Sequence, residues 1–148
     1  MRVLSLTMAF AWLALTAVSQ GGDKKEGSKG GKVIVIKINK DRQYIEEGAK
    51  SQKPVIVKVG QTVRWQNDDS VKHTATSDLE VKTDEPLFDT GDIAAKGKKK
   101  DHMEITFDKE KWDAAAKLLK MPNAKELRLT YYCGHHEGQK SEIILKLK

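Results

Sequence analysis

The stretch Tyr131–Gln139, with the sequence YYCGHHEGQ, contains the only cysteine of the chain and two of its four histidines. It connects two segments, 127–133 and 142–148, that we expect to be β-strands because they are short, apolar and rich in β-formers. Gly134 permits a sharp turn directly after Cys133. A tight loop of this kind brings the side chains of Cys133 and His136 close enough to share one ion.

A thiolate combined with imidazoles is a ligand set for copper, zinc or iron–sulfur chemistry. Iron–sulfur clusters need more cysteines than this chain has, and structural zinc sites use paired cysteines. One cysteine, two histidines and a weak fourth ligand therefore favour a single copper ion. His73 is the candidate for the third strong ligand, because it follows a loop and begins a β-prone segment. His102 lies in an alternating segment after a lysine run, and we interpret it as a surface residue.

The rest of the domain has the pattern of an all-β fold. Between the predicted strands, segments 41–53 and 87–101 are expected to be connections, the second with turns at Gly91 and Gly97. About seven short strands separated by turn signals favour a β-sandwich. The predicted strands are 33–39, 54–59, 62–67, 73–77, 102–107, 127–133 and 142–148.

One segment departs from the β pattern. Asp108 is a suitable N-cap residue, and apolar residues then recur at helical spacing until Pro122 ends the run. The sequence predicts one short amphipathic α-helix over residues 109–120, inserted before the strand that leads to Cys133. Its apolar side is expected to face the core through Trp112, Ala115, Ala116 and Leu119.

The first 32 residues are expected to precede the folded domain. Residues 1–19 have a positive start, an apolar run and small residues before a cleavage position, which is typical of a signal peptide. An uncleaved membrane anchor is the alternative, but the run is shorter than the ~20 residues of a spanning helix. Residues 20–32 are rich in Gly, Ser and Lys and are typical of a flexible linker. The domain is therefore assigned to residues 33–148.

The composition is basic, with a formal net charge of +6 for the whole chain and 32% charged residues. Lysines and acidic residues alternate rather than form blocks, and aromatic residues are few, which argues against nucleic-acid binding. A basic surface instead favours encounter with acidic partners. No segment after residue 19 is long and apolar enough to span a membrane.

Two blocks of the sequence resemble the cupredoxins, the small blue-copper proteins related to plastocyanin and amicyanin. The first is VGQTVRWQNDDSVKHTATS, residues 59–77, and the second is YYCGHHEGQKSEIILKLK, residues 131–148. The resemblance extends over nearly all of residues 33–148 and implies a Greek-key β-sandwich with one copper ion. The matching residues are Gly60, Thr62, Val63, Trp65, Asn67, Asp69, His73, Tyr131, Cys133 and His136.

The resemblance also implies the ligand set. His73, Cys133 and His136 take the equatorial positions, while His135 is expected to be an exposed surface residue. The axial position, which is Met in most members, falls on Gln139, whose amide oxygen is a known substitute. Glu137 is the alternative oxygen donor.

A further departure is Thr74, which occupies a position where many members have Asn. We expect Thr74 to tie the two ligand loops together through its backbone and its hydroxyl.

The function that this resemblance implies is one-electron transfer by an exported protein in the periplasm or outside the cell. The protein is then an electron carrier rather than an enzyme, and we expect it to be a monomer. The expected partners are redox proteins, such as a c-type cytochrome, a reductase or an oxidase, with an acidic docking patch. Two alternatives stay open: a copper carrier or store, and a red-copper-like site that binds a small molecule.

Overall fold

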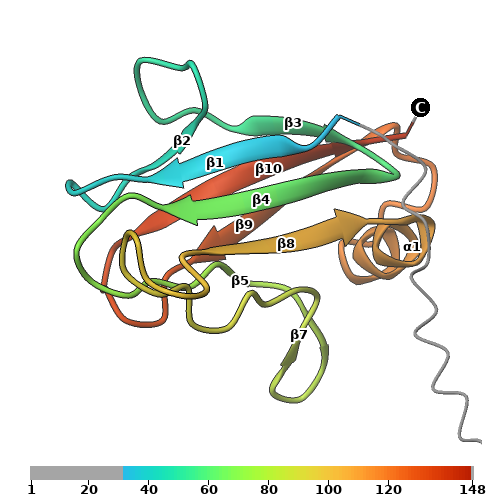
Figure 1. Ribbon diagram of the computed structural model, residues 1–148. Helices are drawn as coiled ribbons and strands as arrows, with labels where there is room; N and C mark the ends of the chain where they lie inside the picture. Colours follow the sequence, from blue (N-terminus) through green and yellow to red (C-terminus); the bar gives the residue numbers. More distant parts are fainter. Residues whose placement is uncertain (1–31, 148) are drawn as a thin grey trace, which may run out of the picture.

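The computed structural model describes residues 32–147, which form two four-stranded sheets packed face to face (Figure 1). The predicted signal peptide, residues 1–19, and all of the predicted linker except Lys32 lie outside the described residues, so both stay predictions. The predicted β-sandwich with one inserted helix is confirmed.

The first sheet has the strand order β2-β1-β4-β8. Strands β1 and β4 are parallel, and Ile36 is in register with Trp65. The other two pairings of this sheet are antiparallel. The strands are β1 (Ile34–Ile38), β2 (Tyr44–Glu46), β4 (Gln61–Asn67) and β8 (His102–Phe107).

The second sheet has the order β3-β10-β9-β5. Strands β3 and β10 are parallel, whereas β9 pairs antiparallel with both β10 and β5. A parallel pair cannot be joined by a tight hairpin, so the chain crosses between the sheets. The strands are β3 (Val55–Lys58), β5 (Thr76–Ser77), β9 (Glu126–Tyr132) and β10 (Lys140–Lys146).

The core lies between the two sheets and is formed by alternate residues of each strand. Val55 and Val57 of β3 are fully buried, as their period-two spacing predicts, and Val59 packs partly buried beside them. Trp65 of β4 meets Tyr131 of β9 across the interface in an edge-to-face contact, with 5.8 Å between ring centroids. Aromatic side chains therefore fill the interior directly below the end of the sandwich where β4 and β9 both finish.

Two parts of the chain differ from the prediction. Segment 41–53, predicted to be a polar connection, contains β2, whose Tyr44 is fully buried. The error arises because β2 is only three residues long and only Tyr44 of it is buried, a pattern too short to be recognised. Segment 73–77 is a strand only at β5, and His73 forms an isolated bridge with Ile93.

A small hairpin was also missing from the prediction. It consists of β6 (Glu80–Lys82) and β7 (Glu85–Pro86), which pair with each other and join neither sheet. No residue of either strand is buried, so the hairpin has no alternating pattern to detect.

The predicted helix is confirmed as α1 (Lys109–Leu118). Asp108 is its N-cap, and its carboxylate accepts a hydrogen bond from the backbone N–H of Lys111 at 2.9 Å. Trp112, Ala115 and Ala116 are buried. Within residues 32–147 no helix is long and apolar enough to cross a membrane.

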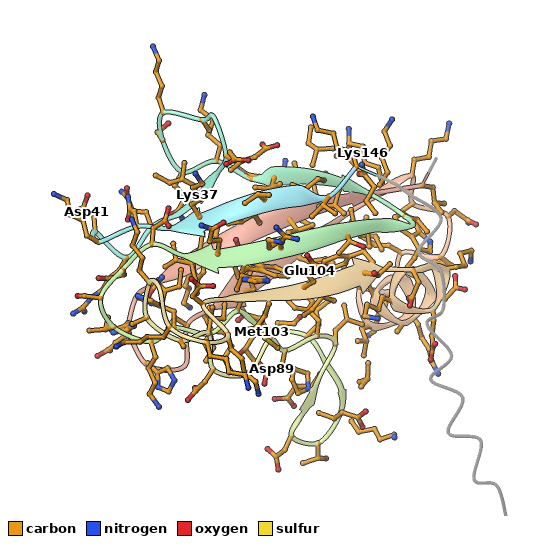
Figure 2. The ribbon with its side chains drawn as sticks, viewed as in Figure 1. Lys37, Asp41, Asp89, Met103, Glu104 and Lys146 are labelled. Carbon is orange, nitrogen blue, oxygen red and sulfur yellow. The ribbon has the colours of Figure 1, made fainter. Side chains whose placement is uncertain are left out.

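The strand directions place four loops at one end of the sandwich, which we call the loop end (Figure 1). These are the loop after β1, the loop after β4, the segment before β8 and the loop between β9 and β10. Helix α1 lies at the opposite end. In Figure 2, Asp41 marks the loop end and Lys146 lies toward the end with α1.

We expect Trp112→Ala to lower the free energy of unfolding by about 3–5 kcal/mol, because it removes a buried aromatic side chain and leaves a cavity. Leu118→Ala, at a position 37% exposed on the same helix, should cost less than about 1 kcal/mol. Urea denaturation followed by fluorescence or circular dichroism measures both. Similar losses for the two variants would contradict the packing described for α1.

Candidate metal centre

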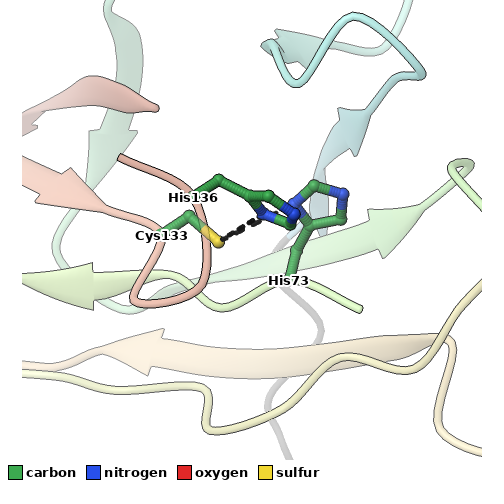
Figure 3. Close-up of side chains that lie close together, drawn as sticks. All are labelled: His73, Cys133 and His136. Carbon is green, nitrogen blue, oxygen red and sulfur yellow. Dashed lines mark hydrogen bonds between the residues drawn. The ribbon is translucent and has the colours of Figure 1, made fainter. Parts of the chain in front are cut away.

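Three side chains at the loop end converge on one point: His73, Cys133 and His136 (Figure 3). One nitrogen from each histidine and the cysteine sulfur all lie within 4.8 Å of one another. The Cys133 Sγ is 3.3 Å from Nδ1 of His136 and 3.7 Å from Nδ1 of His73. These are the residues that the sequence predicted as equatorial ligands, and they form the one such cluster within residues 32–147.

The loop between β9 and β10 holds two of these residues in place. The backbone N–H of Cys133 donates to the carbonyl of Gln139 at 3.0 Å, which closes the loop at its base. Gly138 has a φ of +77°, a conformation that strongly favours glycine, and it returns the chain to β10. Cys133 and His136 therefore project from one tight turn, as their three-residue spacing predicts.

Gln139, the predicted axial residue, belongs to the same group of side chains. It is 6% exposed, and its Oε1 lies 3.0 Å from Nδ1 of His73. The alternative oxygen donor, Glu137, is exposed and is not among the clustered side chains. Of the two predicted oxygen donors, only Gln139 therefore lies against a residue of the cluster.

A hydrogen bond to Asp69 fixes the tautomer of His73. Nε2 of His73 lies 3.0 Å from Oδ2 of Asp69. Burial raises the pKa of Asp69, but hydrogen bonds from His73 and Ser70 outweigh it, and the pKa lies below its usual range. An ionised carboxylate only accepts hydrogen bonds, so Nε2 carries the proton and Nδ1 keeps a free lone pair. Asp69 belongs to the residues that match the cupredoxin pattern, but that match did not predict its bond to His73.

This tautomer gives a test of whether the residues fit a metal ion. Nδ1 of His73 and Oε1 of Gln139 both present lone pairs, and neither can donate to the other across 3.0 Å. A cation between them satisfies both acceptors, whereas without one the amide can turn over and donate its N–H to Nδ1. Nε2 of Gln139 is buried without a hydrogen-bond partner in the described chain. The donor set of two imidazoles, one thiolate and one amide oxygen fits copper.

His136 completes the cluster. It is partly exposed, whereas His73 and Cys133 are buried. Burial lowers the pKa of His136, and the neighbouring His73 and Arg42 lower it further. The neutral imidazole that this favours is the form that binds a metal.

Thr74 connects the two ligand loops as the sequence predicted. Its backbone N–H lies 3.4 Å from Sγ of Cys133, and its Oγ1 accepts a hydrogen bond from the N–H of Gly134 at 2.8 Å. The N–H contact places a hydrogen-bond donor against the sulfur. Thr74 thus links the residue after His73 to both Cys133 and its neighbour.

His135 lies outside the cluster of ligand atoms. Its Nε2 is 2.5 Å from Oδ1 of Asp92, whose other oxygen accepts from Nζ of Lys72 at 2.9 Å. Hydrogen bonds from His135 and Lys72 lower the pKa of Asp92. His135 is exposed, as predicted, yet it also ties the ligand loop to segment 87–101. His102 is exposed and bonded to Asp101, which confirms its interpretation as a surface residue.

Comparisons with known proteins agree with this architecture. No family model and no curated protein matches the sequence. Among solved structures, a single-residue variant of amicyanin in its reduced Cu(I) form at pH 4 matches with a TM-score of 0.52 and 17% identity, over 79% of this chain and 85% of that one. A second variant of amicyanin, also reduced, matches with a TM-score of 0.52 and 17% identity, over 77% and 82% of the chains.

The chain has a cupredoxin-like fold. At this level of identity the likeness concerns the fold alone, which confirms the fold class expected from the sequence. The cupredoxin-like arrangement places the His, Cys and His cluster between the loops at one end of the sandwich.

We expect Thr74→Ala to destabilise the protein by about 0.5–1.5 kcal/mol, because the N–H of Gly134 loses the acceptor of a partly buried hydrogen bond. Thr74→Ser keeps the hydroxyl and should recover most of that loss. Thermal and urea unfolding of both variants, without added metal, make the comparison. Equal stability of the Ala and Ser variants would show that the hydroxyl does not tie the loops.

Proposed function

We propose that the protein is a one-electron carrier that binds a single copper ion through His73, Cys133, His136 and Gln139. The observation that carries the proposal is the convergence of two imidazole nitrogens and one thiol sulfur within 4.8 Å at the end of a rigid sandwich. A bound copper ion would supply the Cu(I)/Cu(II) couple.

The protein's own contribution is to hold the ligands still. Cys133 is fixed by the backbone bond to Gln139 and by the N–H of Thr74, and His73 is fixed by Asp69. Side chains that cannot rearrange keep one geometry in both oxidation states, so little reorganisation accompanies the loss or gain of an electron. His136, which is partly exposed, is the proposed contact through which electrons enter and leave.

Burial also favours an electron carrier over the two alternatives. His73 is 0% exposed and Cys133 is 4% exposed, which suits retention of a metal rather than its rapid release to a partner. Gln139 is buried and fills the axial side, which disfavours an open position for a small molecule. We therefore propose no copper-storage role and no catalytic role.

The cellular setting follows from the sequence. The predicted signal peptide over residues 1–19 supports export to the periplasm or the cell exterior, and we propose that a linker and a domain over 33–148 follow it. We propose a monomer that exchanges electrons with a redox protein, such as a c-type cytochrome, a reductase or an oxidase. An acidic patch on that partner would complement the net positive charge of this chain.

We expect the Cu(II)-loaded domain to show an intense absorption band near ~600 nm with narrow copper hyperfine splitting, because the thiolate is a ligand. Cys133→Ser should abolish the band. Visible and EPR spectra of the two proteins test this directly. A band that persists without Cys133, or a loaded wild-type protein that has none, would contradict the proposal.

Gln139→Met is expected to raise the reduction potential of the loaded protein, because the harder amide oxygen favours the oxidised ion more than a thioether does. Glu137→Gln is the matched control and should leave the potential unchanged, since Glu137 is exposed and outside the cluster. Redox titration of the visible band measures both variants. A shift in Glu137→Gln together with an unchanged Gln139→Met would transfer the axial role to Glu137.

A further inference from the structure

The segment Lys96–Lys100, which we call the lysine loop, has the sequence KGKKK and lies beside the candidate metal centre. We propose that the lysine loop is the docking surface for an acidic redox partner. This inference rests on the proposed electron-transfer function and assigns the partner's contact to one loop.

Hydrogen bonds attach the lysine loop to the residues that position His73. The N–H of Lys96 donates to the carbonyl of Asp69 at 2.8 Å, and Asn67 donates its side-chain N–H to the carbonyl of Ala94 at 3.0 Å. Just before the loop, Asp92 is bonded to His135, the neighbour of His136. The lysine loop therefore lies at the loop end, the same end of the sandwich as the partly exposed His136.

The backbone of the lysine loop is held in a defined shape. The carbonyl of Lys100 accepts from the N–H of Ala94 at 2.9 Å, and the carbonyl of Lys98 accepts from Asp101 at 3.1 Å. Gly97 has a φ of +73°, and its N–H donates to the carboxylate of Asp101 at 3.1 Å. A lysine run on a mobile loop usually only keeps a surface hydrated. Here the side chains of the four lysines project from a backbone that hydrogen bonds hold in one shape.

The positive charge of the lysine loop is not neutralised locally. All four of its lysines are exposed, and none forms an ion pair with another residue of 32–147. Asp101, the acidic residue that follows, is bonded to His102 and to the N–H of Gly97 instead. On the other side of the metal centre, acidic and basic side chains line one shallow cleft together: Asp41, Arg42, Glu137 and Lys140.

A partner that takes an electron from this site must contact the loop end, because His136 is the exposed ligand. Unpaired lysines next to that contact attract an acidic surface and orient it during encounter. Lysines at the opposite end of the sandwich raise the net charge equally but cannot orient a partner toward His136. Partner docking should therefore depend on where the lysines lie and not on the net charge of the protein.

The first test uses the metal-free protein and hexacyanocobaltate(III), a redox-inert trivalent anion. We expect NMR amide shifts at low salt to concentrate in residues 95–101 and to fall at least about threefold in the variant Lys96→Gln, Lys98→Gln, Lys99→Gln. The matched control, Lys58→Gln, Lys117→Gln, Lys125→Gln, removes three exposed and unpaired lysines from the opposite end. Shifts spread over the whole surface, or an equal loss in the control, would overturn the proposal.

The second test follows oxidation of the Cu(I)-loaded protein by hexacyanoferrate(III). We expect the loop variant to lower the second-order rate constant about tenfold at low salt and to flatten its salt dependence, while the control variant changes it much less. A loaded protein that transfers no electron would refute the proposed function. The NMR titration would then be the only test of the lysine loop as a binding surface. Electron transfer that responds equally to both variants would refute the docking surface alone.

Discussion

The two hydrogen-bonding groups of Thr74 join the loops on which the candidate metal centre depends. Its N–H lies against the Cys133 sulfur, and its hydroxyl accepts from Gly134, so one residue next to His73 holds the other ligand loop in register. The two loops come from different sheets, since His73 follows β4 and Cys133 follows β9. Without this connection the packing of the sheets alone would have to set the distance between the ligands.

The loop that carries His73 has its own support below Thr74. Asn67, at the end of β4, donates to the carbonyl of Val71 at 2.7 Å and accepts from the N–H of Asp69 at 2.8 Å. Asp69 in turn holds the ring of His73 with Nδ1 free. The support continues inward to Trp65, which packs against Tyr131 two residues before Cys133. A continuous series of contacts therefore connects the packed core to the ring of His73.

The sequence predicted the parts of this arrangement that have strong local patterns. The alternating valines of β3, the N-cap at Asp108 and the His and Cys spacing at 133–136 each depend on residues close together in the chain. Strand β2 escaped prediction because it is only three residues long and Tyr44 is its one buried residue. Asp69 was noted as a match, but its bond to His73 depends on a loop conformation that spacing does not reveal. The link from His135 to Asp92 spans 43 positions and could not be read from either segment.

The proposed function requires that His73, Cys133 and His136 hold one copper ion in a geometry that does not change with oxidation state. X-ray absorption at the copper edge of the loaded protein, in both oxidation states, measures that geometry. We expect one sulfur and two imidazole nitrogens around copper, with nearly the same distances in Cu(I) and Cu(II). A copper environment without sulfur, or one that loses a ligand on reduction, would contradict it.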